Sequence, residues 1–356
     1  MDLALSPATI KNVEEIEEEV ERLSERCIEV GMQAGLSSVG ITSAEPFREA
    51  HVILEERKEA GYAANMQFTY RNPERSTTPT KIISDAQSLV VGAMHTPAPR
   101  LPESSEGDSR ISAYARKDYY SDLRNSLKSI AELLESEGWK TRVVADDNAL
   151  VDRAAAVRAG LGWVGKNSNV LLPKKGSWFV LGSVVTNAPL VVNEDVVEDE
   201  CGKCTRCIDL CPTGAIVEPG VVDARRCIAW LVQAPGSIPL EFRIAVGNRL
   251  YGCDDCQEVC PVGRHERTKE EIENSSADIP ALELLSYSDE EILDRYGHWY
   301  IAERNPKYLR RNALVVLGNS KKQSPDIEKG IAKYLSDSDP VLKEHAEWAR
   351  SRRRTL

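Results

Sequence analysis

With 356 residues and a formal net charge of −11, the chain is long enough for two or three domains and is poorly suited to coating DNA nonspecifically. Its 42% hydrophobic and 28% charged residues are typical of a soluble protein, and it has no apolar run of about 18 residues that would predict a membrane span. Residues 1–23 are acidic and amphipathic and show no signal peptide, so we expect a cytoplasmic protein.

Two helices and several short strands are predicted in the first half of the chain. Helical periodicity covers residues 12–34 and 121–137, which end before Gly35 and Gly138. Short β-rich runs lie at residues 38–42, 88–93 and 141–144. This alternation of helix and strand predicts an α/β layer. The usual glycine motifs for nicotinamide and ATP binding are absent from the sequence.

Two features of this half have simple structural interpretations. Cys27 falls in the first helix and is expected to be a small buried hydrophobic residue. The Gly-rich segment 160–167 fits either a tight loop around a packed Trp163 or a backbone that closely approaches a large cofactor. The residues alone leave both interpretations open.

The strongest signal is a set of cysteines between residues 201 and 260. The pattern C-x2-C-x2-C-x3-C-P, typical of bacterial ferredoxins, is formed by Cys201, Cys204, Cys207, Cys211 and Pro212. A second run contains Cys253, Cys256, Cys260 and Pro261, with Leu250 where a further cysteine would stand. Cys227 is the only nearby cysteine that could complete it. In a chain without an export signal, this clustering favours metal ligation over disulfides.

The cysteine count predicts two [4Fe–4S] clusters. The first cluster takes Cys201, Cys204, Cys207 and Cys260, and the second takes Cys211, Cys227, Cys253 and Cys256. A pair of structural zinc sites is the alternative, but zinc has no use for a repeated C-x3-C-P. Clusters of this kind transfer single electrons to an acceptor. We expect the long flanking segments to provide the site of that acceptor.

The C-terminal flank is predicted to be helical and locally basic. Residues 305–322 contain five Lys or Arg and no acidic residue, and their apolar residues recur at helical spacing. A second helical segment, residues 341–350, follows Asp339 and Pro340. Such a basic stripe can neutralise phosphates, although an ordinary solvated helix face is the alternative interpretation.

Several segments of the chain resemble epoxyqueuosine reductase, the family that performs the last step of queuosine synthesis on tRNA. The resemblance is carried, in chain order, by ISAYARKDYYSDLRNSLKSI, ADDNALVDRAAAVRAGLGWVGKN, CGKCTRCIDLCPTGAIVEPGVVDARRCIAWL, GNRLYGCDDCQEVCP and, more loosely, YLRRNALVVLGNS. It covers most of the chain from about residue 35. It implies an α+β protein with three parts: an N-terminal α/β cobalamin-binding domain similar to reductive dehalogenases, a ferredoxin-like module with two [4Fe–4S] clusters, and a C-terminal HEAT-like helical cap. We expect these parts at residues 1–190, 191–270 and 271–356.

The resemblance also implies cofactors and partners. Cobalamin is expected base-off beside the clusters, and because no D-x-H-x-x-G is present a histidine lower ligand is not expected. The substrate would be tRNA that bears epoxyqueuosine. An external donor such as flavodoxin or ferredoxin would supply electrons, and we expect a monomer with no membrane partner.

Asp146 matches the family's proton donor, at the start of a D-x-x-x-L-x-D-R segment. A carboxyl walled by corrin and ring surfaces should have a raised pKa. The alternative is that Asp146 or its neighbour Asp147 caps the following helix. Family members often carry a histidine where Tyr120 stands, which affects the substrate side of the site.

Other site residues follow from the resemblance position by position. Those matched to cobalamin contacts are Arg75, Asp146, Asn167, Val170, Leu181, Asp254 and Asp255. A surface Arg and ordinary core residues in strands are the alternative interpretations. The predicted tRNA contacts are Lys307, Arg310 and Arg311. A reductive dehalogenase-like reductase of a small molecule and a plain electron-transfer protein are the competing functions; the basic C-terminal segment argues against the first and the long N-terminal flank against the second.

Overall fold

A four-stranded antiparallel sheet forms the centre of the N-terminal part. The structure is a computed structural model and describes residues 13–96, 108–193, 195–263 and 278–356. The strand order is β1 (Ser38–Ser43), β2 (Ser88–His95), β7 (Phe179–Thr186) and β4 (Thr141–Ala145). Every neighbouring pair is antiparallel, and β2 and β7 pair from Ser88↔Thr186 to His95↔Phe179. The predicted strands are confirmed, but the α/β layer is wrong, because an alternation of helix and strand does not fix strand direction.

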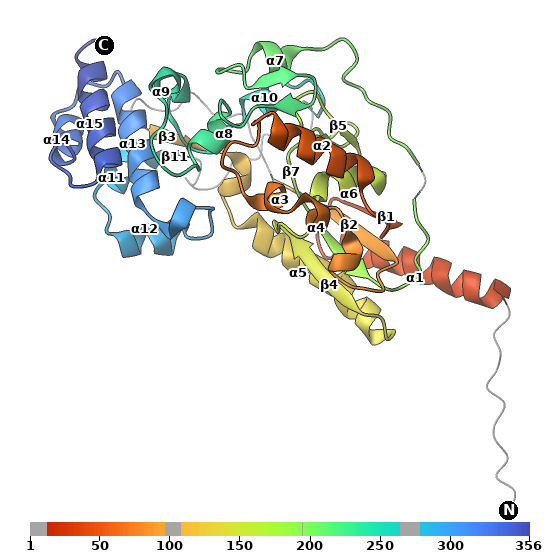
Figure 1. The fold of residues 1–356 in the computed structure, drawn as a ribbon. Coiled ribbons are helices and arrows are strands. Elements are labelled where there is room, and N and C mark those ends of the chain that lie inside the picture. The colour runs from red at the N-terminus through yellow and green to blue at the C-terminus, as the bar shows by residue number, and fades with distance from the viewer. Residues whose placement is uncertain (1–12, 97–107, 194, 264–277) are drawn as a thin grey trace, which may run out of the picture.

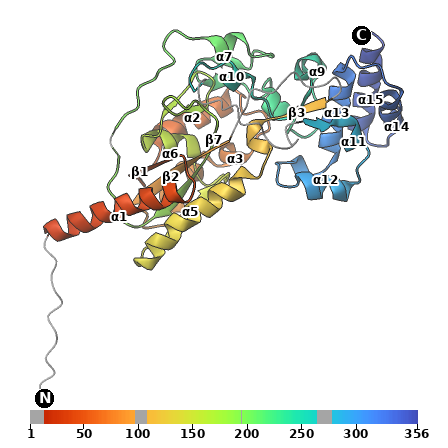
Figure 2. The ribbon, with the colours of Figure 1, turned by 180° about the vertical axis from the view of Figure 1, so that it is seen from behind.

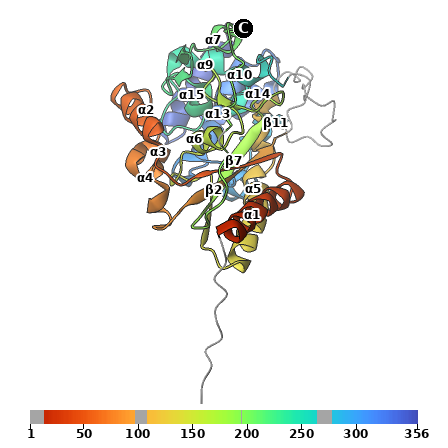
Figure 3. The same cartoon turned by 90° about the vertical axis from the view of Figure 1, so that its right-hand side faces the viewer.

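Helices cover both faces of this sheet. Helices α1 (Val13–Gln33) and α5 (Tyr119–Ser136) lie on one face, and α2 (Arg48–Glu59) and α4 (Pro73–Ser76) lie on the other side (Figure 3). Figure 2 shows α1 and α5 side by side. In β2, Val90 packs under α1 and α5, whereas Leu89 and Val91 pack on the other face with α6 (Asp152–Arg158). This alternation follows from the two-residue period of a strand. Cys27 is fully buried in the first of these cores, as predicted.

The cysteine-rich module is built from short elements between long loops. They are α7 (Arg206–Asp209), β8 (Ile216–Glu218), β9 (Val221–Val222), α8 (Ile228–Leu231), α9 (Leu240–Val246), β10 (Arg249–Tyr251) and α10 (Asp255–Glu258). Helices α7 and α10 each contain one cysteine of a C-x2-C pair, so the two runs have similar local structure.

The C-terminal part is helical, as expected. Its helices are α11 (Ala281–Leu284), α12 (Asp289–Tyr296), α13 (Lys307–Asn319), α14 (Pro325–Lys333) and α15 (Pro340–Arg353), gathered at one end of the molecule (Figure 1). Helix α13 is central and packs most extensively on α15. The Asp339 carboxylate caps α15 by accepting the N–H groups of Val341 and Leu342. The HEAT-like arrangement stays a prediction.

One small sheet joins the three parts of the chain. Strand β3 (Asp108–Ile111) pairs in parallel with β10 and antiparallel with β11 (Asp278–Pro280). Ile111, Leu250, Tyr251 and Ile279 enter the same core as α13 and α15. The cysteine module therefore shares its core with both flanks. Short elements complete the fold: α3 (Phe68–Arg71), η1 (Pro79–Lys81), η2 (Ala113–Ala115), β5 (Trp163–Val164), β6 (Val170–Leu171) and η3 (Ala302–Arg304). Over the described ranges, no helix is both long and apolar enough to cross a membrane.

Candidate active site

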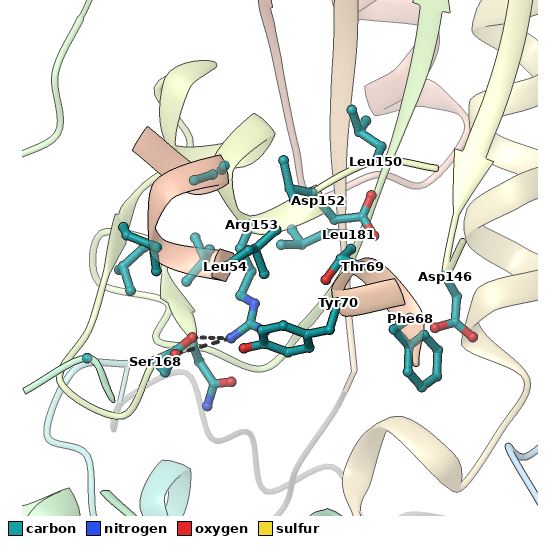
Figure 4. A pocket seen from close by; sticks show the side chains of 18 of the residues that line it. Leu54, Phe68, Thr69, Tyr70, Asp146, Leu150, Asp152, Arg153, Ser168 and Leu181 are labelled. Atoms are coloured by element: carbon teal, nitrogen blue, oxygen red, sulfur yellow. Dashed lines mark hydrogen bonds between the residues drawn. The ribbon is translucent and has the colours of Figure 1, made fainter. Parts of the chain in front are cut away.

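Two adjoining cavities form a chamber between the N-terminal sheet and the cysteine module. The larger one has a volume of about 710 Å³ and the smaller about 400 Å³. Both are lined by Tyr70, Tyr120, Arg153, Ser168 and Phe179, so they are continuous. Figure 4 shows part of the larger cavity. A chamber of this size between two layers suits a large cofactor.

Asp146 lies where this chamber meets a third hollow. It directly follows β4 and has a left-handed φ of 54°, a conformation that Asp tolerates better than most residues. Its side chain lines both the larger cavity and a hollow of about 180 Å³. Burial raises the pKa of Asp146, while the charge of Arg124 acts in the opposite direction. The carboxyl therefore holds its proton to a higher pH than an exposed aspartate.

The neighbouring Asp147 has a different role. Its Oδ1 accepts the N–H of Ala149 at 2.9 Å and closes a local turn. Helix α6 begins only at Asp152, and its N-cap residue, Val151, has no side-chain cap. The interpretation of Asp146 or Asp147 as a helix cap is therefore wrong, because the chain makes a turn between them and the helix.

Arg75 supports the same loop from outside the chamber. Its Nη1 donates to Asn148 Oδ1 at 3.2 Å, and Ser76 Oγ donates to the Asn148 carbonyl at 2.5 Å. Arg75 is not among the described residues that line the two cavities. In this structure it positions the loop that carries Asp146, so its predicted cofactor contact would require a different side-chain direction.

The third hollow is aromatic. It is lined by Phe68, Tyr114, Tyr120, Tyr251, His298, Trp299 and Tyr300, together with Lys117 and Asp146. The rings of Phe68 and Tyr300 have centroids 5.4 Å apart, and those of Tyr251 and Trp299 stack at 4.4 Å. Flat aromatic walls of this kind suit a planar ring system. The residues come from the N-terminal part, from β10 of the cysteine module and from the C-terminal part, so all three parts contribute to the site.

The pKa shifts of the thiols show which cysteines lie near one another. Burial and the nearby thiol groups of Cys260, Cys201 and Cys204 raise the pKa of Cys207. Burial and then Cys253, Cys227, Asp254 and Cys207 raise the pKa of Cys256, and Cys211 adds to the raised pKa of Cys227. Because Cys207 of the first predicted set also acts on Cys256 of the second, the assignment of ligands to two clusters stays a prediction.

Among the described residues, no three His, Cys, Asp or Glu side chains are close enough together to hold a single metal ion. The two predicted [4Fe–4S] clusters stay a prediction from the cysteine spacing. No disulfide joins any of the nine cysteines, all of which lie in described segments.

Only one of the two cysteine groups reaches the chamber. Cys211, Cys227, Cys253 and Cys256 all line the smaller cavity, whereas none of the other four appears in its described lining. The second predicted cluster would therefore lie between the first and the chamber. This order gives electrons a direct path from the module toward Asp146.

The remaining residues predicted to contact the cofactor line the chamber in different ways. Val170 and Leu181 line the larger cavity, and Asn167 lines the smaller one, where its Oδ1 accepts the N–H of Asn169 at 3.1 Å. Asp254 and Asp255 also line the smaller cavity, but their carboxylates already have partners. Asp254 accepts the N–H of Ala113 at 2.8 Å, and Asp255 accepts Arg249 Nε at 2.9 Å.

Sequence reasoning missed Asp152 and Arg153, which also line the larger cavity. Adjacent residues on a helix point in different directions, and these two form no ion pair in the described structure. Arg153 Nη1 donates instead to the Ser168 carbonyl at 2.6 Å (Figure 4). Asp152 Oδ1 is buried without a hydrogen-bond partner. Their place in the D-x-x-x-L-x-D-R segment was the only available signal.

The predicted tRNA contacts on α13 are largely used within the protein. Arg311 is fully buried, and its guanidinium donates to the carbonyls of residues 231, 232, 234 and 236. Its assignment to tRNA is wrong, because helical periodicity placed it on the basic stripe while packing turned it inward. Arg310 pairs with Asp289 and Lys307 pairs with Asp339 at 3.1 Å. A role for Lys307 and Arg310 stays a prediction.

Comparison with known proteins gives a consistent family. Residues 200–263 match the 4Fe-4S double cluster binding domain. The epoxyqueuosine reductase of Bacillus anthracis is 35% identical over 342 residues, which cover 92% of this chain and 88% of that protein. A crystal structure of epoxyqueuosine reductase with an epoxyqueuosine-modified tRNA-Tyr stem loop has 33% identity and a TM-score of 0.84, covering 93% of this chain and 90% of that one. A Bacillus subtilis epoxyqueuosine reductase, described with its aspartate catalytic loop swung out of the active site, has 32% identity, a TM-score of 0.83 and the same coverage.

Proposed function

The chain belongs to the epoxyqueuosine reductase family, and from this we propose that it reduces epoxyqueuosine to queuosine in tRNA, with Asp146 as the proton donor. One observation carries the assignment of roles. Asp146 lies between a chamber that reaches four cluster cysteines and an aromatic hollow formed with the C-terminal part. Electrons, a proton and a planar substrate can therefore meet at one carboxyl group.

The chamber fits cobalamin by its chemistry. Its wall combines apolar side chains, such as Leu54, Val170 and Leu181, with the polar groups of Arg153 and Asn169. A corrin ring with amide side chains would need both kinds of contact. We propose that cobalamin binds base-off, and the described lining of the two cavities offers no histidine as a lower ligand. When bound, cobalamin supplies a strongly reducing cobalt centre.

The protein's own residues orient the reaction. Val170 and Leu181 present an apolar surface, the Asp147 turn holds the backbone after Asp146, and Arg75 supports that loop from outside. The raised pKa of Asp146 favours its protonated form more than in an ordinary aspartate, and the carboxyl can deliver this proton to the epoxide oxygen. Two [4Fe–4S] clusters on the eight module cysteines would pass the electrons from an external one-electron donor.

The aromatic hollow is our proposed site for the modified base. Enzymes that act on a base in RNA take it out of the stack and hold it against aromatic side chains. Phe68, Trp299 and Tyr300 offer such surfaces beside Asp146. Lys117 at the same hollow is mostly exposed, although it pairs with Asp122, and it can attract a phosphate. We propose that the C-terminal helices, as a HEAT-like cap, hold the adjoining stem.

Spectroscopic titration tests this assignment. We expect the anaerobically reconstituted protein to bind one cob(II)alamin per chain, with the absorption change of a base-off species. We also expect tRNA that bears epoxyqueuosine to bind more weakly to a Phe68→Ala, Tyr300→Ala variant, because stacking contributes about 1–3 kcal/mol per base. A protein with full iron content that binds neither cobalamin nor this tRNA would exclude the proposed function.

A further inference from the structure

The proposed reaction needs more protons than Asp146 carries. Removing the oxygen of an epoxide to leave a carbon–carbon double bond consumes two electrons and two protons, and the oxygen leaves as water. One carboxyl group delivers one proton. A site closed from water by a bound cofactor and substrate must therefore obtain the second proton from another group or reload Asp146 during the reaction.

Asp152 is a second acid in the same chamber. It is the first residue of α6 and lines the larger cavity that Asp146 also lines. Figure 4 labels both residues among those that line this cavity. Asp152 Oδ1 is buried without a hydrogen-bond donor among the described residues. Desolvation of this oxygen without a hydrogen-bond donor disfavours the ionised carboxylate.

The charged groups around Asp152 support its holding a proton. Burial raises the pKa of Asp152 well above its usual value, and the charges of Asp146 and Asp147 act in the same direction. Arg153 opposes them, but its guanidinium is directed to Ser168. Each of two carboxyl groups that share one chamber opposes the ionisation of the other.

Tyr120 lies where it can connect the two acids. It lines the larger cavity, the smaller cavity and the aromatic hollow. Burial raises the pKa of its phenol, and the charges of Asp146 and Asp152 both add to this shift. Its hydroxyl can donate one hydrogen bond and accept another, as a proton relay requires. This chain has a tyrosine where a histidine was expected, so the relay would use a neutral hydroxyl.

We propose that Asp152 is a second proton store that supplies Asp146 through the Tyr120 hydroxyl, an inference that rests on the proposed function. Asp146 gives its proton to the epoxide oxygen as one C–O bond breaks. The Tyr120 hydroxyl then passes a proton to the Asp146 carboxylate and takes the Asp152 proton in its place. Asp146 delivers this second proton as the remaining C–O bond breaks and water leaves. A low-potential one-electron donor supplies both electrons through the clusters, and solvent reloads Asp152 after product release.

Infrared titration of the protein without cobalamin and tRNA tests the proton store directly. We expect the difference spectrum of the parent minus Asp152→Asn at pH 7 to contain the C=O stretch of a protonated carboxyl group, because a band from Asp146 is common to both proteins and cancels. The matched control, Asp147→Asn, removes a neighbouring carboxyl of the same cavity, and the parent minus Asp147→Asn spectrum should lack this band. A parent minus Asp152→Asn spectrum without the band would overturn the proposal and leave the proposed function untouched.

The pH dependence of turnover tests the connection to Asp146. In Asp152→Asn we expect the falling limb of the rate profile to move to lower pH by about one unit, a loss of about tenfold above the limb. Tyr120→Phe should shift the limb in the same direction, and Asp152→Glu should restore it in part. A merely structural role would lower the rate equally at every pH, and that result would reject the relay.

Discussion

Asp146 shows how one residue acquires a role from its surroundings. Its neighbour Asp147 has the same side chain, but the Asp147 carboxylate accepts a hydrogen bond from the Ala149 N–H. Asp146 instead lines both the chamber and the aromatic hollow. The left-handed backbone at Asp146 turns the chain there. Strained backbone of this kind is common at functional sites. Both residues line the larger cavity, and the difference is that Asp146 alone of the two also lines the aromatic hollow.

Replacing Asp146 by Asn tests this difference. Asn keeps the size and most hydrogen bonds of the side chain but cannot deliver a proton at neutral pH. We expect epoxide reduction to fall by about 10²–10⁴-fold, the usual contribution of a general acid. Cobalamin binding and iron content should remain. Asp147→Asn should lose much less activity, because its amide oxygen can still accept the Ala149 N–H. Near-normal turnover in cobalamin-loaded Asp146→Asn would remove Asp146 from the mechanism.

His345 makes the stability of the C-terminal part depend on pH. Burial and the charge of Arg243 lower its pKa to about 4. Its Nδ1–H donates to the Val341 carbonyl at 2.7 Å, and Nε2 accepts the Ile238 N–H at 3.2 Å, so the folded state needs the neutral ring. The unfolded state, with a pKa of about 6.5, binds more protons between these values, so stability falls as the pH falls.

We expect this histidine to cost about 2 kcal/mol of unfolding free energy between pH 7 and pH 5. Chemical denaturation of the cluster-loaded protein, followed by tryptophan fluorescence, measures the change. In His345→Gln the difference between the two pH values should shrink by a similar amount. An equal pH dependence in variant and parent would show that His345 is not the group responsible.

Among the helices, α13 was predicted near its position, but the burial of Arg311 was not predicted. The predicted segment 305–322 is longer than Lys307–Asn319 at both ends, and the residues of its apolar pattern, Leu309, Ala313, Val316 and Leu317, are buried. Arg311, however, also lies inside, because the loop at residues 231–236 presents carbonyls that only a buried donor can satisfy. Periodicity cannot reveal such a partner, since the loop lies about 80 residues away in the sequence.

Arg311→Met should therefore destabilise the protein more than it weakens tRNA binding. Several carbonyls would lose their donor at once, and we expect the free energy of unfolding to fall by at least about 3 kcal/mol. Lys321→Met, which removes an exposed charge just beyond the same helix, is the control and should change stability by less than about 0.5 kcal/mol. Equal stability of the two variants would contradict the buried role of Arg311.

In the cysteine module, the candidate ligands could be predicted from the sequence, but their surroundings could not. Its residue spacing alone predicted two sets of four cysteines, and their assignment as cluster ligands stays a prediction. What spacing could not show is that the second group lines the chamber, because that depends on packing against the N-terminal sheet. Metal ligands are fixed by local chemistry, whereas a cavity is formed by residues that are distant in sequence.

Cys227→Ser should remove the second cluster selectively. No other cysteine near Cys211, Cys253 and Cys256 can replace it, so iron should fall from about eight to about four atoms per chain. The control is Cys27→Ala, which changes a cysteine in the core under α1 and should keep the full iron content. Chemical iron analysis and the visible spectrum report the result. Full iron in Cys227→Ser would show that the ligand set is misassigned.

For the whole molecule, the important feature is that the three parts share structure. Strands from the N-terminal part, the cysteine module and the C-terminal part meet in the sheet β10–β3–β11. The aromatic hollow likewise combines residues of the N-terminal part with His298, Trp299 and Tyr300. Sequence analysis predicted the order of the parts, but contacts between distant segments could not be read from local patterns. These contacts fix the positions of the cysteine module, the proposed proton donor Asp146 and the aromatic hollow relative to one another.

The most direct test of the account is a mass measurement on the nucleosides of treated tRNA. The anaerobically reconstituted protein is incubated with cobalamin, a low-potential reductant and tRNA that bears epoxyqueuosine, and the tRNA is then digested. We predict a nucleoside lighter by one oxygen atom, with two electrons consumed for each one formed, and almost none with Asp146→Asn. An unchanged nucleoside mass, with both clusters and cobalamin loaded and the tRNA bound, would contradict the account.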